Sequence, residues 1–256
     1  MKSLDGTDEI TNIACFFVHP DYRSYGIGSK LFESAIKPKR EEKKNMTILS
    51  GSMSEKYDKR HGFNKYCDFL YECYLIPMDV FDENVLREES ALFEAALQRK
   101  GVKIVDVSEV EDEQIMEFDR KIVNFDRKQF VSAWLRRDDS FSKVAIDLTS
   151  GKVLGYASLR TGRGKQLIFS PIFADSEDIA FGLTLSALGA VPAIKSYAFV
   201  YFGAPSTNNS IKTLIAKLSN EKFVTEETLQ RHFTLKVPPI NEKKIYTFTL
   251  YGLVFV

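Results

Sequence analysis

The stretch that decides the fold is Phe16–Lys30, FFVHPDYRSYGIGSK. An apolar run leads into a turn with a proline, Arg23 follows, and Gly26 and Gly28 stand just before a helical pattern. Glycine lets a backbone approach a ligand closely, and the free N–H groups of a first helical turn attract anions. The same glycine spacing also occurs where a helix merely packs closely on a strand. The stretch therefore predicts a strand, a loop and a helix, and leaves both phosphate binding and simple packing open.

Two common phosphate-binding motifs do not match this loop. A Walker loop ends in Gly-Lys-Ser/Thr, whereas Gly28, Ser29 and Lys30 stand in the wrong order. A Rossmann fingerprint needs three glycines and an acidic residue about 20 positions further on. The chain has two glycines here and then a charge run, KPKREEKK at 37–44, that is typical of a solvated loop.

The wider stretch resembles the acetyl-CoA motif of the GNAT superfamily of N-acetyltransferases. In that superfamily an apolar strand leads into V-x-P-x-x-R, then Arg/Gln-x-x-Gly-x-Gly/Ala and a helix. The residues that match in place are Val18, Pro20, Arg23, Gly26 and Gly28. A later segment, YDKRHGF from Tyr57 to Phe63, resembles the Tyr…Gly-Phe end of the next helix, with the tyrosine five rather than four positions before the glycine. The resemblance covers residues 10–75.

The resemblance implies a cofactor, acetyl-CoA, and a set of contacts to it. The backbones of Phe17 and Val18 would meet the pantetheine where two parallel strands splay after Val18. The pyrophosphate would be held by the backbone amides of Arg23, Ser24, Tyr25, Gly26, Ile27 and Gly28, together with Ser29. An amine-bearing substrate, a small molecule or a protein, would attack the thioester directly.

Tyr57 is the candidate general acid for the leaving thiolate, and packing of its helix on the sheet is the alternative role. The expected strand carries no carboxylate that could act as the base. Asp8 and Glu9 lie upstream, and an ordered water is the other option. We expect His19 to have a structural role in its turn and Cys15 to lie in the core.

The hydrophobic pattern predicts alternating strands and helices, hence an α/β chain with a mixed sheet and helices on its faces. In the first part we expect an inner strand at Ile13–Val18, a helix from Gly28 that Pro38 ends, and a helix at Ser54–His61 capped by Gly62. The remaining expected elements are strands at Thr47–Leu49, Phe69–Leu75, Val102–Val107, Lys143–Leu148, Val153–Leu159, Gln166–Phe169, Ser196–Phe202, Phe233–Val237 and Tyr246–Val256, and helices at Glu113–Val123, Lys128–Leu135, Ile179–Ala187 and Ser210–Leu218.

This order predicts a partial GNAT-like domain at 1–78 with the acetyl-CoA loop, a linker at 79–100, and a complete GNAT-like copy at 101–256. In the second copy, Ile168–Asp175 stands where the cofactor loop belongs, without Gly-x-Gly and with acids that repel a pyrophosphate. It resembles the degenerate second domain of tandem acetyltransferases, a type expanded in nematodes. Because the first copy lacks the family's opening strands and helices, we expect a truncated first domain whose activity is in doubt.

Composition limits the partners. Lys+Arg and Asp+Glu both number 35, so the formal charge of zero gives no support for nucleic acid or an anionic membrane surface. Three cysteines without metal spacing and only three histidines argue against a zinc site and for a reduced, cytoplasmic or nuclear location. We therefore expect an acetyl-CoA-dependent N-acetyltransferase, or alternatively an inactive acyl-CoA-binding relative or interaction module. No residue pattern identifies the acceptor or an oligomeric state.

Overall fold

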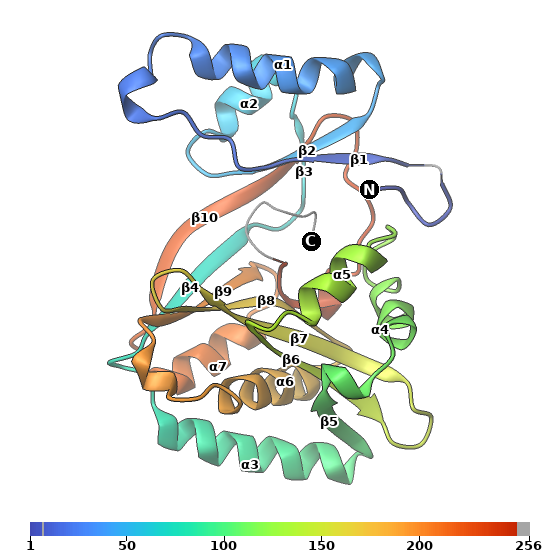
Figure 1. Ribbon diagram of the computed structural model, residues 1–256, viewed down its shortest axis with the longest axis vertical. Helices are drawn as coiled ribbons and strands as arrows, with labels where there is room; N and C mark the ends of the chain where they lie inside the picture. Colours follow the sequence, from blue (N-terminus) through green and yellow to red (C-terminus); the bar gives the residue numbers. More distant parts are fainter. Residues whose placement is uncertain (7, 250–256) are drawn as a thin grey trace.

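The structure, a computed structural model, describes residues 1–6 and 8–249. Within these residues one mixed sheet of eleven strands runs through the whole molecule (Figure 1). Its main path is β1-β2-β10-β4-β9-β8-β7-β6-β5, with β3 attached to β10 and β11 to β8. The strands are β1 Ile10–Ile13, β2 Asn45–Ser50, β3 Lys65–Tyr66, β4 Tyr71–Pro77, β5 Val102–Asp106, β6 Ser140–Asp147, β7 Val153–Gly162, β8 Gln166–Ala174, β9 Phe199–Pro205, β10 Val224–Phe233 and β11 Ile245–Thr247.

The helices cover the sheet in three groups, one of which, α4 and α5, lies on the face opposite α6 (Figure 1). At one end α1 and α2 lie on β1 and β2, and at the other end α3, α6 and α7 lie together against the larger part of the sheet (Figure 1). The α-helices are α1 Ile27–Glu41, α2 Ser54–His61, α3 Glu83–Arg99, α4 Asp112–Asp119, α5 Lys128–Leu135, α6 Glu177–Gly189 and α7 Ser210–Leu218. The α/β fold class with a mixed sheet is confirmed.

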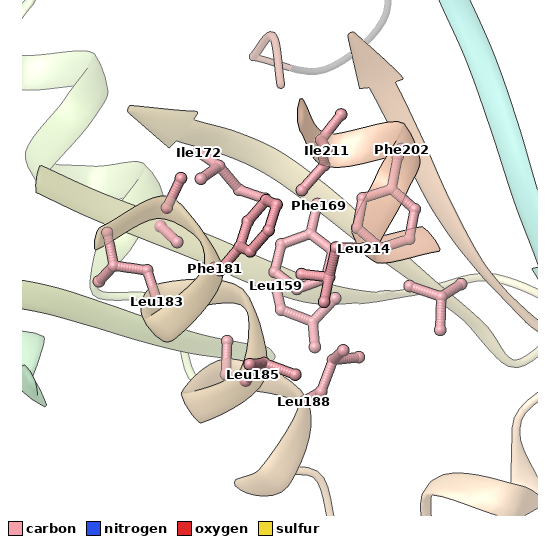
Figure 2. Close-up of a cluster of buried hydrophobic side chains, with 14 of the residues drawn as sticks. Leu159, Phe169, Ile172, Phe181, Leu183, Leu185, Leu188, Phe202, Ile211 and Leu214 are labelled. Carbon is pink, nitrogen blue, oxygen red and sulfur yellow. The ribbon is translucent and has the colours of Figure 1, made fainter. Parts of the chain in front are cut away.

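The larger core lies between α6 and the sheet. Side chains of α6, such as Phe181 and Leu188, face Leu159 and Phe169 from the strands (Figure 2). The other side of α6 lies against α3, where a Cβ on Gly182 would come 2.5 Å from Leu97 Cδ1. Because α6 is enclosed on both sides, it is apolar around its whole circumference rather than amphipathic.

Two strands interlock the N-terminal and C-terminal parts. β4, from the segment expected to belong to the first domain, pairs antiparallel with β9 from Tyr71↔Pro205 to Pro77↔Phe199. β10, from the other end of the chain, pairs with β4 through Val224–Leu229 and with β2 through Gln230–Phe233. The division into units at 1–78 and 101–256 stays a prediction, and hydrogen bonds of one continuous sheet join the two segments.

Several elements match the sequence analysis and others differ. α5 and α7 have the expected bounds, and α2 ends at Gly62 in the left-handed region, with φ 75°. Pro38 does not end α1, which continues to Glu41. Its ring removes one N–H that would bond Ser34, but both residues are exposed, so water can satisfy the Ser34 carbonyl.

The strand β8 is longer than expected, and β10 lies elsewhere. β8 continues through Pro171 to Ala174, so most of Ile168–Asp175 is strand and not loop. The β7–β8 register shifts between Ala157 and Leu159, a bulge of the kind that tolerates a proline. The last regular strand before residue 240 is Val224–Phe233 instead of Phe233–Val237. The end of the predicted strand Tyr246–Val256, residues 250–256, lies outside the described residues.

Candidate functional site

The two parallel strands β1 and β2 separate at the candidate site. They pair over four positions, from Ile10↔Asn45 to Ile13↔Ile48. Residues 14–19 then have no regular structure, so the expected strand Ile13–Val18 is wrong in its placement. Cys15 has φ 57°, in the left-handed region, and this turns the chain away from β2. A splay of parallel strands is thus present, but it opens after Ile13 and not after Val18.

The segment after the splay lies on the surface. Phe17 is 65% and Phe16 39% exposed, and Cys15 is exposed too, so neither the buried inner strand nor the core position of Cys15 is found. The apolar run at Ile13–Val18 predicted a strand buried on both faces, but α1 and α2 cover only one face of the sheet here (Figure 1). Tyr25, 77% exposed, and Ile27, 44% exposed, continue this apolar surface around the loop.

The loop before α1 points backbone N–H groups outward. Ser24 and Gly26 have φ of 70° and 76°, and Gly26 is the N-cap of α1 without a side-chain cap. The first helical hydrogen bond is Lys30 N to Gly26 O, at 3.1 Å. The amides of Ile27, Gly28 and Ser29 precede it and have no intrahelical acceptor. Together with the helix dipole they form a concentration of partial positive charge.

The two glycines have different roles. A Cβ on Gly26 would meet no atom within 4 Å, so that position faces open space next to the free amides. A Cβ on Gly28 would come 3.2 Å from Val18 Cγ2 and 3.5 Å from Phe16 Cζ. Gly28 therefore lets the helix start lie close to the segment after the splay, while Gly26 supplies the left-handed turn.

Arg23 connects the loop to the segment at Phe17 and Val18. Its Nε donates to Val18 O at 3.0 Å, and its guanidinium lies 5.6 Å from the Phe17 ring centroid. Among the described residues its terminal Nη groups have no protein acceptor. The cation is thus held at the loop with donors left for an anion.

Tyr57, the candidate acid, is half-buried in an aromatic cluster behind this loop. Its ring centroid lies 5.2 Å from that of Phe32 on α1 and 6.4 Å from that of Phe63. A tyrosine phenol is protonated at neutral pH, and burial raises the pKa of Tyr57 further. Its ring contacts are those of packing, and its protonated state is the one that a general acid requires.

A histidine that the sequence analysis did not single out lies in the same cluster. His61 stands one turn after Tyr57 on α2, with its ring 4.6 Å from that of Phe32 and Nδ1 3.4 Å from Glu33 Oε2. Burial lowers the pKa of His61, which favours the neutral imidazole. The sequence could have indicated His61, because its i, i+4 spacing from Tyr57 places both rings on one face of the helix.

The upstream carboxylates do not fit a catalytic base. Glu9 Oε2 lies 2.5 Å from Lys44 Nζ, whose hydrogen bond lowers the pKa of Glu9. Asp8 Oδ1 lies 2.7 Å from Lys236 Nζ. His19 Nδ1 accepts from Asp21 N at 3.4 Å, as a turn histidine would.

The family model for the acetyltransferase (GNAT) domain matches residues 115–247, just over half of the chain. The chain belongs to the GNAT acetyltransferase family. This matched region extends from α4 to β11 and so lies C-terminal to the Arg23–Ser29 loop. GNAT acetyltransferases transfer acyl groups from acyl-CoA to amine-bearing substrates, and the fold and family of this chain support acyl transfer of that kind.

Solved structures share this GNAT fold over most of the chain. A Pyrococcus horikoshii protein named as an inferred acetyltransferase has TM-score 0.57 and 18% identity, covering 92% of this chain and 69% of its own. A tandem GNAT protein from the clavulanic acid biosynthesis pathway has TM-score 0.55 and 15% identity, covering 91% and 77%. A GCN5-related N-acetyltransferase from Sphaerobacter thermophilus has TM-score 0.54 and 12% identity, covering 84% and 70%. No curated protein sequence matches the chain.

The described residues contain neither a metal-binding cluster nor a membrane-spanning helix. In residues 1–6 and 8–249, no group of three or more His, Cys, Asp or Glu side chains is arranged to hold a metal ion. Within the same part of the chain, every helix is too short or too polar to cross a bilayer.

Proposed function

We propose that this GNAT protein is an acetyl-CoA-dependent N-acetyltransferase whose cofactor site is the loop Arg23–Ser29. The observation that carries the proposal is the set of three N–H groups at Ile27, Gly28 and Ser29, which lack intrahelical acceptors beside the splay of β1 and β2. The three free cysteines support a reducing compartment, the cytoplasm or the nucleus.

The residues present fit a diphosphate at this loop. Gly26 has open space where a side chain would otherwise stand, and the amides beside it lead directly into α1. Arg23 holds its charge at the same loop, and the helix dipole adds to it. The backbone amide of Arg23, expected to join the pyrophosphate site, already donates to Pro20 O at 3.1 Å. In this proposal the amides from Ser24 to Gly28, with Ser29, therefore hold the pyrophosphate.

The segment at Phe17 and Val18 would hold the pantetheine arm through its backbone. Its residues have no sheet partner after the splay, so their N–H and C=O groups are accessible, apart from Val18 O, which accepts from Arg23. Acetyl-CoA supplies a thioester carbonyl that an amine can attack.

The chain's own part in the reaction is to place and move protons. Tyr57, whose phenol is protonated at neutral pH as in any tyrosine of ordinary or raised pKa, would donate to the departing sulfur. Since Asp8 and Glu9 are engaged with lysines, an ordered water would take the proton of the incoming amine.

A second candidate function is an acyl-CoA-binding protein without turnover. The observation that favours it is that both candidate bases, Asp8 and Glu9, are in ion pairs with lysines. Such a protein would keep the loop and lose the transfer step.

Two measurements separate these functions. Calorimetry with CoA measures binding, and thiol release from acetyl-CoA with a panel of amines measures turnover. The proposed enzyme gives both, and the binding protein gives heat without thiol release. A chain that gives no heat with CoA at millimolar concentration refutes both.

A further inference from the structure

The C-terminal part of the chain contains a second splay of parallel strands. β8 and β9 pair in parallel at Gln166↔Phe199, Leu167↔Val200 and Ile168↔Tyr201, and then separate. The helix α6 follows β8 directly, as α1 follows the splay of β1 and β2. The two halves of the molecule thus repeat one arrangement: parallel strands that part, then a helix.

The second splay is filled by the chain itself. β11 runs antiparallel to β8, with Ile245 opposite Phe173 and Thr247 opposite Ile172. On its other side, Phe248 N donates to Gly203 O of β9 at 2.7 Å. β11 therefore bridges the two strands at the point where they have separated.

The filling segment is buried along its length. Ile245 and Thr247 are 0% exposed, and Tyr246, Phe248 and Thr249 are 5%, 4% and 3% exposed. The Phe248 ring stacks on that of Tyr71, with centroids 3.7 Å apart and planes at 20°. A segment enclosed in this way belongs to the core, and the cavity beside Phe248, about 20 Å³, has room for about one water molecule and not for an acyl-CoA arm.

The acidic residues where β8 and β9 separate attract the lysine that precedes β11, and they would repel a phosphate. Lys244, immediately before β11, places Nζ 2.6 Å from Oδ1 of Asp175, which stands between β8 and α6. Asn208 Nδ2 donates to Ile245 O at 2.9 Å. The first turn of α6 carries Glu177 and Asp178 beside its N-terminus. The loop at the first splay has the opposite charge, because it carries Arg23 and amides without a side-chain cap.

We propose that β11 is a permanent occupant of the second splay and closes it to acyl-CoA. The C-terminal part then acts as a closed scaffold, and within residues 1–6 and 8–249 one acyl-CoA site remains, at Arg23–Ser29. The location of that one site rests on the proposed function, whereas the seating of β11 stands on its own contacts.

Hydrogen exchange of the full chain, with and without CoA, tests this. Without ligand, we expect amides of the 245–249 peptide to exchange as slowly as those of 170–174, because both belong to one buried ladder. With saturating CoA, we expect new protection at 23–30 and no change at 170–175 or 245–249. Fast exchange of 245–249 in the free protein, or a change at either second-splay peptide on adding CoA, overturns the proposal. If CoA protects none of these peptides, the proposed cofactor site is wrong. The exchange of 245–249 relative to 170–174 without CoA still tests whether β11 stays between β8 and β9.

A matched pair of variants tests the ionic anchor. Lys244→Glu places a carboxylate beside Asp175, whereas Lys243→Glu changes the same charge at an exposed neighbour. We expect roughly fivefold faster exchange of 245–249 in the first variant and unchanged exchange in the second. Equal exchange in both variants overturns the role given to Lys244 in holding the segment.

Discussion

Position 26 gives the sharpest test of the cofactor loop. Gly26 has φ 76° and open space where a Cβ would lie, so a substitution there meets backbone strain but no clash. Asn and Asp tolerate the left-handed region better than other side chains. Gly26→Asn and Gly26→Asp therefore make a matched pair, equal in shape and different by one negative charge. We expect each to lose about 1 kcal/mol of stability or less and to remain folded.

The two variants should differ in their affinity for CoA. Two like charges about 4 Å apart repel by about 1 kcal/mol in water and by about 4 kcal/mol near a protein surface. The carboxylate at position 26 would stand next to the amides of Ile27–Ser29, where the diphosphate is proposed to lie. We therefore expect Gly26→Asp to bind CoA at least about fivefold more weakly than Gly26→Asn, from the lower of these energies.

Calorimetry at two salt concentrations measures this difference. Because the Debye length falls from about 10 Å at 0.1 M to about 3 Å at 1 M salt, the ratio of the two dissociation constants should shrink at high salt. Equal affinities of the Asp and Asn variants at low salt, with both folded, would refute the placement of the diphosphate at this loop. A ratio that stays the same at high salt would contradict charge repulsion as the cause of the weaker binding.

Three further perturbations follow from the structure. Tyr57→Phe should lower turnover about 10²-fold, the low end for general acids, and leave the CoA dissociation constant nearly unchanged; equal losses in steady-state kinetics and calorimetry would make Tyr57 a packing residue. Arg127→Met should cost about 3–5 kcal/mol of unfolding free energy, because it leaves the Asp119 carboxylate buried without the guanidinium 2.6 Å away; urea unfolding measures this, and the double variant with Asp119→Leu should recover most of the loss. Burial lowers the pKa values of His61 and His232 below 6.5, so the unfolded chain binds protons more tightly. The contribution of these two histidines to the unfolding free energy should be fully present above about pH 6.5 and should decrease as the pH falls below it. The urea concentration at the unfolding midpoint should therefore be higher at about pH 7.5 than at about pH 5.5, and a midpoint independent of pH would contradict this.

The sequence by itself determined the elements whose signals are local. The glycines at 26 and 28 predicted the loop and the start of α1, and Gly62 predicted the end of α2. The alternation of strands and helices gave the α/β class and the resemblance to the GNAT family, because both depend on residues close together in the chain.

The tertiary structure decided where strands begin, end and find partners. Apolar spacing could not show that Phe16 and Phe17 lie on the surface, because burial depends on which faces other elements cover. β10 and β11 gain their hydrogen bonds from strands far away in the sequence, such as β2 and β8. A strand's backbone groups are satisfied by its neighbours in space, so only the folded sheet could show that residues 245–248 lie between the separated strands β8 and β9.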